Sequence, residues 1–97
     1  MQMAKVRGTV VGTQKLPSMT GVKLLLLQFL DENGELLPKY EVAADSVGAG
    51  LEEWVLVNRG SAARQEEGHH NRPLDAMVVA IIDTVTVDNR RIYGEYQ

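Results

Sequence analysis

Two glycines separated by one residue, Gly48 and Gly50, form the most plausible ligand-binding loop of this chain. Glycine has no Cβ atom, so such a loop can take left-handed conformations and lets another molecule approach its backbone closely. A dinucleotide fingerprint also needs a third glycine and the N-terminus of a following helix to hold the pyrophosphate. Here Glu53 stands at the third position, and a strand is expected to follow. The pattern favours a structural loop or a subunit contact over a phosphate site.

Two other features could carry chemistry: the adjacent histidines His69 and His70, and the hydroxyl of Ser61. Metal sites usually bring three or four ligands together, and no third ligand accompanies the histidine pair in the sequence. A nucleophilic serine needs a general base, which distant residues can supply, but none lies near Ser61 in the sequence. We therefore expect no catalytic residue, no metal site and no cofactor. An enzyme that uses Ser61 or His70 is the least favoured hypothesis.

The charge pattern bears on nucleic-acid binding. The chain has 13 acidic and 10 basic residues, and the basic residues are scattered singly except for Arg90 and Arg91. Proteins that bind nucleic acid concentrate lysine and arginine on one face, because released counterions supply much of the affinity. Phe29 and Trp54 lie within apolar segments, which favours packing over base stacking. We expect no nucleic-acid partner.

Length and composition set further limits. Ninety-seven residues suffice for one hydrophobic core, so we expect a single domain over residues 1–97. The absence of cysteine excludes disulfides and fits a reducing cytoplasm. The longest apolar runs, residues 24–27 and 77–82, are far below the roughly 20 residues that span a membrane. The N-terminus lacks the apolar region of a secretory signal. We expect a cytoplasmic protein outside the membrane.

The elements that must position these residues are mostly strands, because apolar residues recur with period two. Asn33-Gly34 lies between two apolar runs and predicts a hairpin with a type I′ turn. Pro38 should lie near the start of its strand or on an edge. Ser61 could cap a short helical turn at 60–65. The predicted strands are residues 3–11, 22–31, 36–45, 53–58, 77–87 and 89–93, with loops at 12–21 and 66–71.

This pattern predicts an all-β fold, a small OB-like antiparallel barrel of five to six strands with one short helical turn. Two of the strands are apolar on both faces, although a barrel turns only one face inward. Monomers rarely leave a large apolar patch in water, so we expect self-association. In one strand Val22, Leu24, Leu26 and Leu30 oppose Leu25, Leu27 and Phe29, and in the other Met77, Val79 and Ile81 oppose Val78, Ala80 and Ile82.

Several blocks of residues also match a known family in the right order. They are residues 5–6, 8–11, 20–26, 45–50, 53–57, 60–64, 72–79 and 81–83. Together they cover nearly the whole chain and resemble the CcmL/EutN family of bacterial microcompartment vertex proteins. Within that family, the sequence is most similar to the cyanobacterial carboxysome members.

The resemblance implies an OB-like barrel that forms homopentamers at the five-fold vertices of an icosahedral carboxysome shell, without catalysis. Hexameric shell proteins would be its neighbours. The shell would enclose ribulose bisphosphate carboxylase and carbonic anhydrase and so support carbon dioxide fixation in photosynthesis. The alternative is an OB-like binding module for single-stranded nucleic acid or a peptide. By the family's pattern, the expected subunit-interface residues near the five-fold axis are Asp45, Gly48, Ala49, Gly50, Ser61, Ala62 and Arg64.

Overall fold

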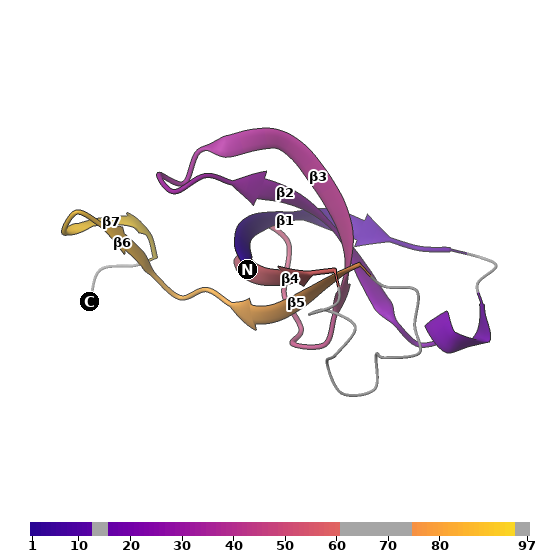
Figure 1. Cartoon of the computed structure of the whole chain (residues 1–97). Coiled ribbons are helices and arrows are strands. Elements are labelled where there is room, and N and C mark those ends of the chain that lie inside the picture. The colour runs from indigo at the N-terminus through magenta and orange to yellow at the C-terminus, as the bar shows by residue number, and fades with distance from the viewer. Residues whose placement is uncertain (13–15, 61–74, 95–97) are drawn as a thin grey trace.

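The computed structural model describes residues 1–12, 16–60 and 75–94. Five strands form a closed barrel in the order β1-β2-β3-β5-β4, and two further strands form a separate two-stranded sheet (Figure 1). The predicted all-β barrel is therefore confirmed. Its elements are β1 Gln2–Val10, η1 Pro17–Met19, β2 Lys23–Leu30, β3 Leu36–Asp45, β4 Trp54–Arg59, β5 Ala76–Ile81, β6 Val85–Val87 and β7 Arg90–Tyr93.

The barrel closes through one parallel contact. β1 pairs antiparallel with both β2 and β4, and β4 pairs antiparallel with β5. β5 then runs parallel to the end of β3, where Ala44 pairs with Met77 and Asp45 with Val78. Because β5 meets β3 only at these last two residues, the end of β3 is fixed at the closure of the barrel. The loop that contains Gly48 and Gly50, which we call the glycine loop, begins at this point.

The interior of the barrel follows the period-two pattern of the strands. Alternate residues of β1, β2 and β4 point inward, as the alternation predicted, and alanine and valine dominate because five strands enclose a narrow interior. Phe29 is fully buried among them, in agreement with its predicted packing role. The core cluster is Ala4, Val6, Leu25, Leu27, Phe29, Ala43, Ala49, Val55, Val57, Ala76 and Val78.

The hairpin between β2 and β3 is confirmed, but its predicted turn type is wrong. Gly34 has a φ of +81°, whereas Asn33 does not have the positive φ that a type I′ turn requires. Instead the Gly34 N–H donates to the Asp31 carbonyl at 3.1 Å. The Asp31 carboxylate accepts from the N–H groups of Asn33 and Glu35 at 2.8 and 2.9 Å. The aspartate side chain thus shapes a longer turn. Pro38 is the third residue of β3, near its start as predicted.

The predicted strand over residues 77–87 is interrupted. β5 ends at Ile81, and the Ile82 N–H makes a last bond to the Trp54 carbonyl at 2.8 Å before the chain leaves the barrel. β6 then pairs with β7, the predicted last strand, through a turn in which Asp88 and Asn89 both have positive φ. β-branched residues favour strand structure but do not mark which strands share a sheet. Composition alone therefore could not locate the break.

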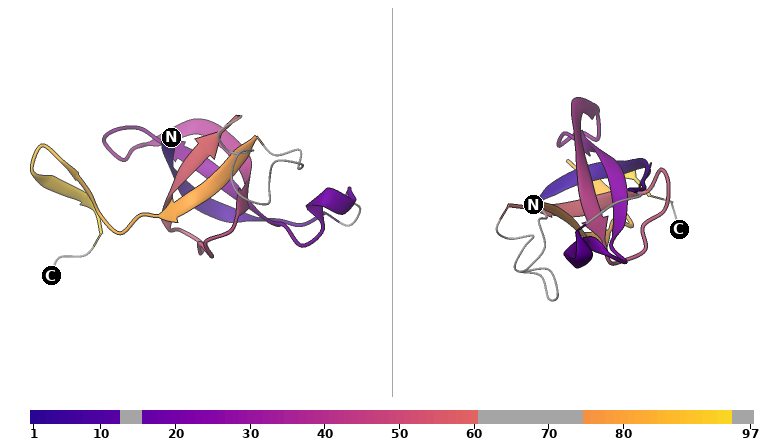
Figure 2. Two further views of the ribbon diagram at one scale, coloured as in Figure 1. Left: turned by 60° about the horizontal axis from the view of Figure 1, so that its bottom comes forward. Right: turned by 90° about the vertical axis from the view of Figure 1, so that its right-hand side faces the viewer.

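The molecule is elongated, at 46 × 27 × 24 Å. The β6–β7 hairpin projects from one end of the barrel, and η1 lies at the other (Figure 2). η1 is the single helical turn of the described residues and lies in a segment predicted as loop. The helical turn predicted at 60–65, apart from Gly60, and the loop predicted at 66–71 lie outside the described residues. In the part of the chain that the structure describes, no helix is long and apolar enough to cross a membrane.

Candidate subunit interface

The glycine loop after β3 is organised by the buried carboxylate of Asp45. Its side chain is 0 % exposed, and its two oxygens accept three backbone hydrogen bonds. Val47 and Gly48 donate to Oδ1 at 2.9 and 3.1 Å, and Ala49 donates to Oδ2 at 2.9 Å. A carboxylate at a strand end that collects successive N–H groups fixes the turn that follows it. The shape of the loop is thus set within the chain.

Lys23 and Glu53 complete the loop. The Lys23 ammonium lies 3.4 Å from Asp45 Oδ2 and donates to the Ala49 carbonyl at 3.3 Å. The Gly50 N–H donates to the Glu53 carboxylate, which stands at the position of the missing third glycine. Four successive N–H groups of the loop therefore already bond to carboxylates of the same chain. A phosphate would have to displace them, which favours a structural loop over an anion site.

The predicted interface residues that the structure describes lie together in this loop but face different ways. Asp45 and Ala49 are buried, and Ala49 belongs to the core cluster. Gly48 and Gly50 are exposed, and Gly48 has a φ of +83° with open space where a Cβ would lie. Of these residues, the two glycines are the ones available to a neighbouring molecule. Ser61, Ala62 and Arg64 lie outside the described residues, so their role stays a prediction.

The same loop exposes apolar side chains that the sequence reasoning did not single out. Val47 and Leu51 flank the glycines, and Leu51 is 64 % exposed. The sequence could have indicated these two residues, because they are large apolar residues in a glycine-containing turn. An exposed apolar residue alone is common, but two beside backbone-accessible glycines suit a contact with another protein surface.

A second apolar surface covers the outside of β2 and β3. Leu26 pairs with Val42 across the two strands, and Leu24 pairs with Ala44. Leu24 and Leu26 are half-buried, whereas Tyr40 and Val42 are 55 % and 46 % exposed. The outward apolar face predicted for residues 22–31 is found at Leu24 and Leu26, whereas the exposed apolar residues of β3 beside it were not predicted. We call Leu24, Leu26, Leu36, Tyr40 and Val42 the β2–β3 outer face.

The matching expectation for β5 needs correction. Met77 and Val78 lie on opposite faces of this strand, and both are buried, Met77 at 3 % exposure. Ile81 packs against the barrel core. Both faces of β5 are therefore buried at its start within the single chain, where Ala76, Met77 and Val78 are all buried. The need for a partner is therefore concentrated on the β2–β3 outer face. Leu30, which the sequence pattern grouped with Leu24 and Leu26, is buried and does not add to it.

Charged residues form isolated pairs. Lys5 lies 2.8 Å from Glu52, and a hydrogen bond from this lysine, followed by its charge, lowers the pKa of the Glu52 carboxyl. Arg59 lies 3.7 Å from Glu41. Within residues 1–12, 16–60 and 75–94, no three His, Cys, Asp or Glu side chains gather closely enough to hold a metal ion.

Comparison with known proteins decides between the remaining possibilities. Residues 1–83 match the family model described as ethanolamine utilisation protein EutN/carboxysome. The chain belongs to the EutN/CcmL family. The resemblance seen in the sequence is confirmed, and the comparisons give no support to the alternative of a nucleic-acid or peptide-binding module.

Members of the EutN/CcmL family match this chain over nearly its full length. It is 70 % identical to the carboxysome shell vertex protein CcmL of Nostoc sp., over 98 % of this chain and 95 % of that protein. Identity to CcmL of Gloeobacter violaceus is 66 %, with the same coverage. The solved structure of the Gloeobacter protein has a TM-score of 0.93 and covers 98 % of each chain. The pentameric microcompartment shell protein GrpN of Rhodospirillum rubrum is 43 % identical, with a TM-score of 0.82, over 92 % of this chain and 100 % of GrpN.

Proposed function

We propose that this chain is a structural shell protein that forms homopentamers and caps the five-fold vertices of a carboxysome shell. The observation that carries this function is the similarity to carboxysome shell vertex proteins, 60 to 70 % identical over 98 % of this chain. The protein would lie in the cytoplasm as part of the shell. By completing a closed shell, it would support carbon dioxide concentration and fixation.

A ring of five identical chains fits the surfaces described above. Cyclic assemblies use heterologous contacts, in which one patch meets a different patch on the next copy. This chain offers two candidate patches, the β2–β3 outer face and the glycine loop with Val47 and Leu51 beside it. The first is apolar and the second combines apolar side chains with accessible backbone. Such surfaces support stable association between copies.

A structural role without catalysis is consistent with the chemistry of the described residues. The buried carboxylate Asp45 holds backbone N–H groups of the loop that follows it. The Glu53 carboxylate accepts from Gly50 and is likewise committed to the loop. Both acids therefore serve the fold. Hexameric shell proteins are the expected neighbours of a pentamer in a closed shell, because five-fold units supply the curvature that flat tiles lack.

Substitution of Val42 by lysine tests this function at the β2–β3 outer face. Val42 is exposed in the single chain, so Val42→Lys should leave the barrel folded. In the pentamer the lysine would place a charge in an apolar contact, which is costly without a partner. We expect association at least about tenfold weaker, measured by analytical ultracentrifugation.

The matched control is Thr86→Lys, which adds the same charge at an exposed β-branched position of the β6–β7 hairpin. It should leave the oligomer unchanged. Equal association of the Val42→Lys variant and the wild type would contradict the placement of the contact on this face.

A further inference from the structure

Asn33 is the one asparagine of this chain that precedes a glycine. Asn58, Asn71 and Asn89 are each followed by arginine. Asparagine is thermally labile, because its side-chain amide reacts with the backbone nitrogen of the next residue. A side chain on that next residue hinders the approach, and glycine has none. The Asn33-Gly34 step of the β2–β3 turn is therefore the place in the sequence where this reaction meets the least steric resistance.

The structure leaves the side chain of Asn33 accessible. Asn33 is exposed and lines a groove of about 340 Å³ between the β2–β3 turn and the β6–β7 hairpin. Its backbone N–H donates to the Asp31 carboxylate, but its side-chain amide makes no hydrogen bond to another described residue. The Gly34 N–H donates to the Asp31 carbonyl at 3.1 Å. Hydrogen bonds in exposed turns open at little cost in free energy, so the Gly34 nitrogen is available to the Asn33 side chain.

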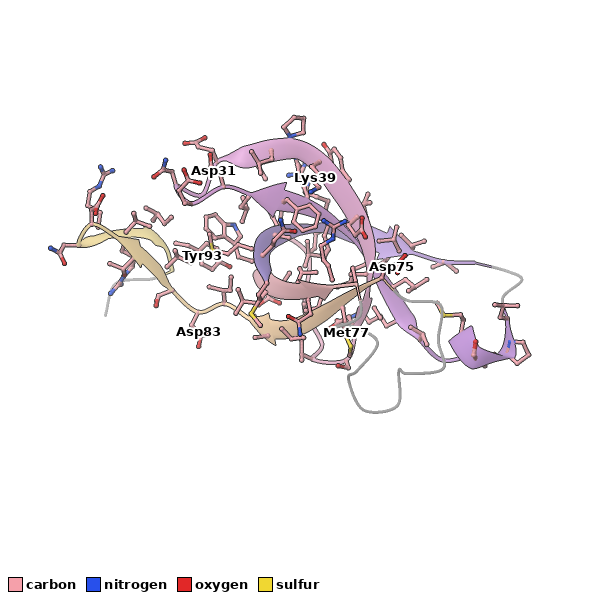
Figure 3. The ribbon with its side chains drawn as sticks, viewed as in Figure 1. Asp31, Lys39, Asp75, Met77, Asp83 and Tyr93 are labelled. Atoms are coloured by element: carbon pink, nitrogen blue, oxygen red, sulfur yellow. The ribbon has the colours of Figure 1, made fainter. Side chains whose placement is uncertain are left out.

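The same turn has no spare room on the side of Gly34 that faces the barrel. A Cβ atom on Gly34 would lie 2.7 Å from the Trp54 ring and 3.3 Å from the Ile92 side chain. The Trp54 ring in turn stacks on that of Tyr93, with centroids 4.2 Å apart and planes 13° from parallel. Figure 3 shows Tyr93 between the hairpin and the barrel, near the turn that holds Asp31. The close fit of Gly34 thus joins the β2–β3 turn, the start of β4 and the β6–β7 hairpin.

We propose that Asn33 is a modification site, at which spontaneous conversion to isoaspartate moves the β2–β3 turn away from Trp54. The Gly34 nitrogen attacks Cγ of Asn33, the bond from Cγ to the side-chain nitrogen breaks, and ammonia leaves with the proton of the Gly34 N–H. Water then opens the cyclic imide that has formed. Opening at the side-chain carbonyl gives aspartate. Opening at the main-chain carbonyl of residue 33 gives isoaspartate, in which the backbone runs through the former side chain and is one carbon atom longer.

The two products differ in what they do to the turn. Both add a carboxylate beside Asp31, Glu32 and Glu35, whose charges it repels. Only isoaspartate also inserts an atom into the backbone next to Gly34. Because the fit of Gly34 against the Trp54 ring leaves no room for even one added carbon, the longer backbone displaces the turn. Water then reaches the Trp54 ring, and the hairpin loses the turn against which Ile92 packs.

Ageing of the purified full-length protein at mildly alkaline pH tests the proposal, because loss of the Gly34 amide proton starts the reaction. Peptide mass spectrometry should show the peptide of Asn33 gaining the mass difference between a hydroxyl and an amino group. An isoaspartyl methyltransferase should transfer a labelled methyl group to the same peptide. Asn89 is the internal control and should stay intact, because it is likewise exposed in a turn but precedes Arg90. The emission of Trp54, the single tryptophan, should shift to longer wavelength as the label accumulates.

Two variants separate the steps. Asn33→Gln should keep its emission through the same period, because glutamine would have to close a larger ring. Freshly purified Asn33→Asp adds the charge without lengthening the backbone, and its emission should match that of the wild type. An Asn33 that stays intact as long as Asn89 overturns the modification site. Isoaspartate at residue 33 with unchanged emission, or a shifted emission in fresh Asn33→Asp or aged Asn33→Gln, overturns the displacement of the turn by the longer backbone.

Discussion

At the scale of single residues, Asp45 determines the shape of the glycine loop. The sequence predicted the loop from its glycines but gave Asp45 no internal role. An aspartate followed by serine, valine and glycine is compatible with a solvated turn as well as with a buried one. Whether the turn is solvated or buried depends on the closure of the barrel, which places this aspartate beside β5. That contact joins residues more than thirty positions apart, beyond the reach of local patterns.

Asp45→Asn should destabilise the fold. Asp45 uses both oxygens, so an amide would leave either the Ala49 N–H or the N–H groups of Val47 and Gly48 facing an NH₂ group. It would also remove the charge that faces Lys23. Loss of partners for buried donors costs about 1–3 kcal/mol. The free energy of unfolding in urea measures this change.

The matched control is Asp31→Asn in the β2–β3 turn. There a single oxygen accepts both backbone bonds, and an asparagine retains one such oxygen. Its unfolding free energy should stay close to that of the wild type. An equally small effect of Asp45→Asn would contradict the organising role of that residue.

Gly48→Val should impair assembly more than folding. The positive φ of Gly48 imposes a backbone cost of roughly 1–2 kcal/mol on a side chain. The space around its Cβ is open within the chain, so any further loss must come from a neighbouring copy. Gly48→Asn is the control, because asparagine tolerates this conformation better. Unchanged oligomer size in Gly48→Val would contradict a close contact at the loop.

At the scale of elements, the strands of the barrel followed from period-two patterning, because one face of each strand must be buried. The turn type and the break after Ile81 did not follow. The Asp31 side chain accepts hydrogen bonds from the turn, and the type I′ turn that Asn33-Gly34 suggested does not form. The strand is interrupted after Ile81 because the next segment, β6, pairs with β7 and not with a strand of the barrel. The stacking of Trp54 on Tyr93 was equally hidden, because it joins two elements far apart in sequence.

Tyr93→Ala should release the β6–β7 hairpin while the barrel stays folded. The variant removes the ring that stacks on Trp54 and the hydroxyl that accepts a hydrogen bond from the Trp54 backbone N–H. The ring pair alone contributes roughly 0.5–1.5 kcal/mol beyond burial. Trp54 is the single tryptophan of the chain, so its fluorescence reports directly on this contact. Its emission should shift to longer wavelength as water reaches the ring.

Tyr93→Phe keeps the ring and removes only the hydroxyl group. Its emission should stay near that of the wild type, with a small loss of stability from the missing hydrogen bond. Identical spectra for Tyr93→Ala and the wild type would show that the stacked pair does not hold the hairpin in place.

At the scale of the whole molecule, three surfaces extend from one barrel. We propose that the β2–β3 outer face and the glycine loop contact neighbouring copies in the pentamer, whereas the β6–β7 hairpin projects from one end of the barrel (Figure 2). The sequence predicted that an apolar surface would need a partner, but it could not show which strands leave their apolar side chains exposed. On β5, Met77 and Val78 lie on opposite faces, and both are buried within the single chain. The family resemblance supplied the five-fold symmetry, which no pattern within one chain encodes.

The mass of the assembly in solution tests the central claim most directly. Native mass spectrometry of the wild-type protein across micromolar concentrations should give a dominant species of five times the 10.7 kDa chain mass. That species should persist on dilution, because a closed ring has no open ends from which to lose subunits. A stable monomer throughout this range would contradict the account.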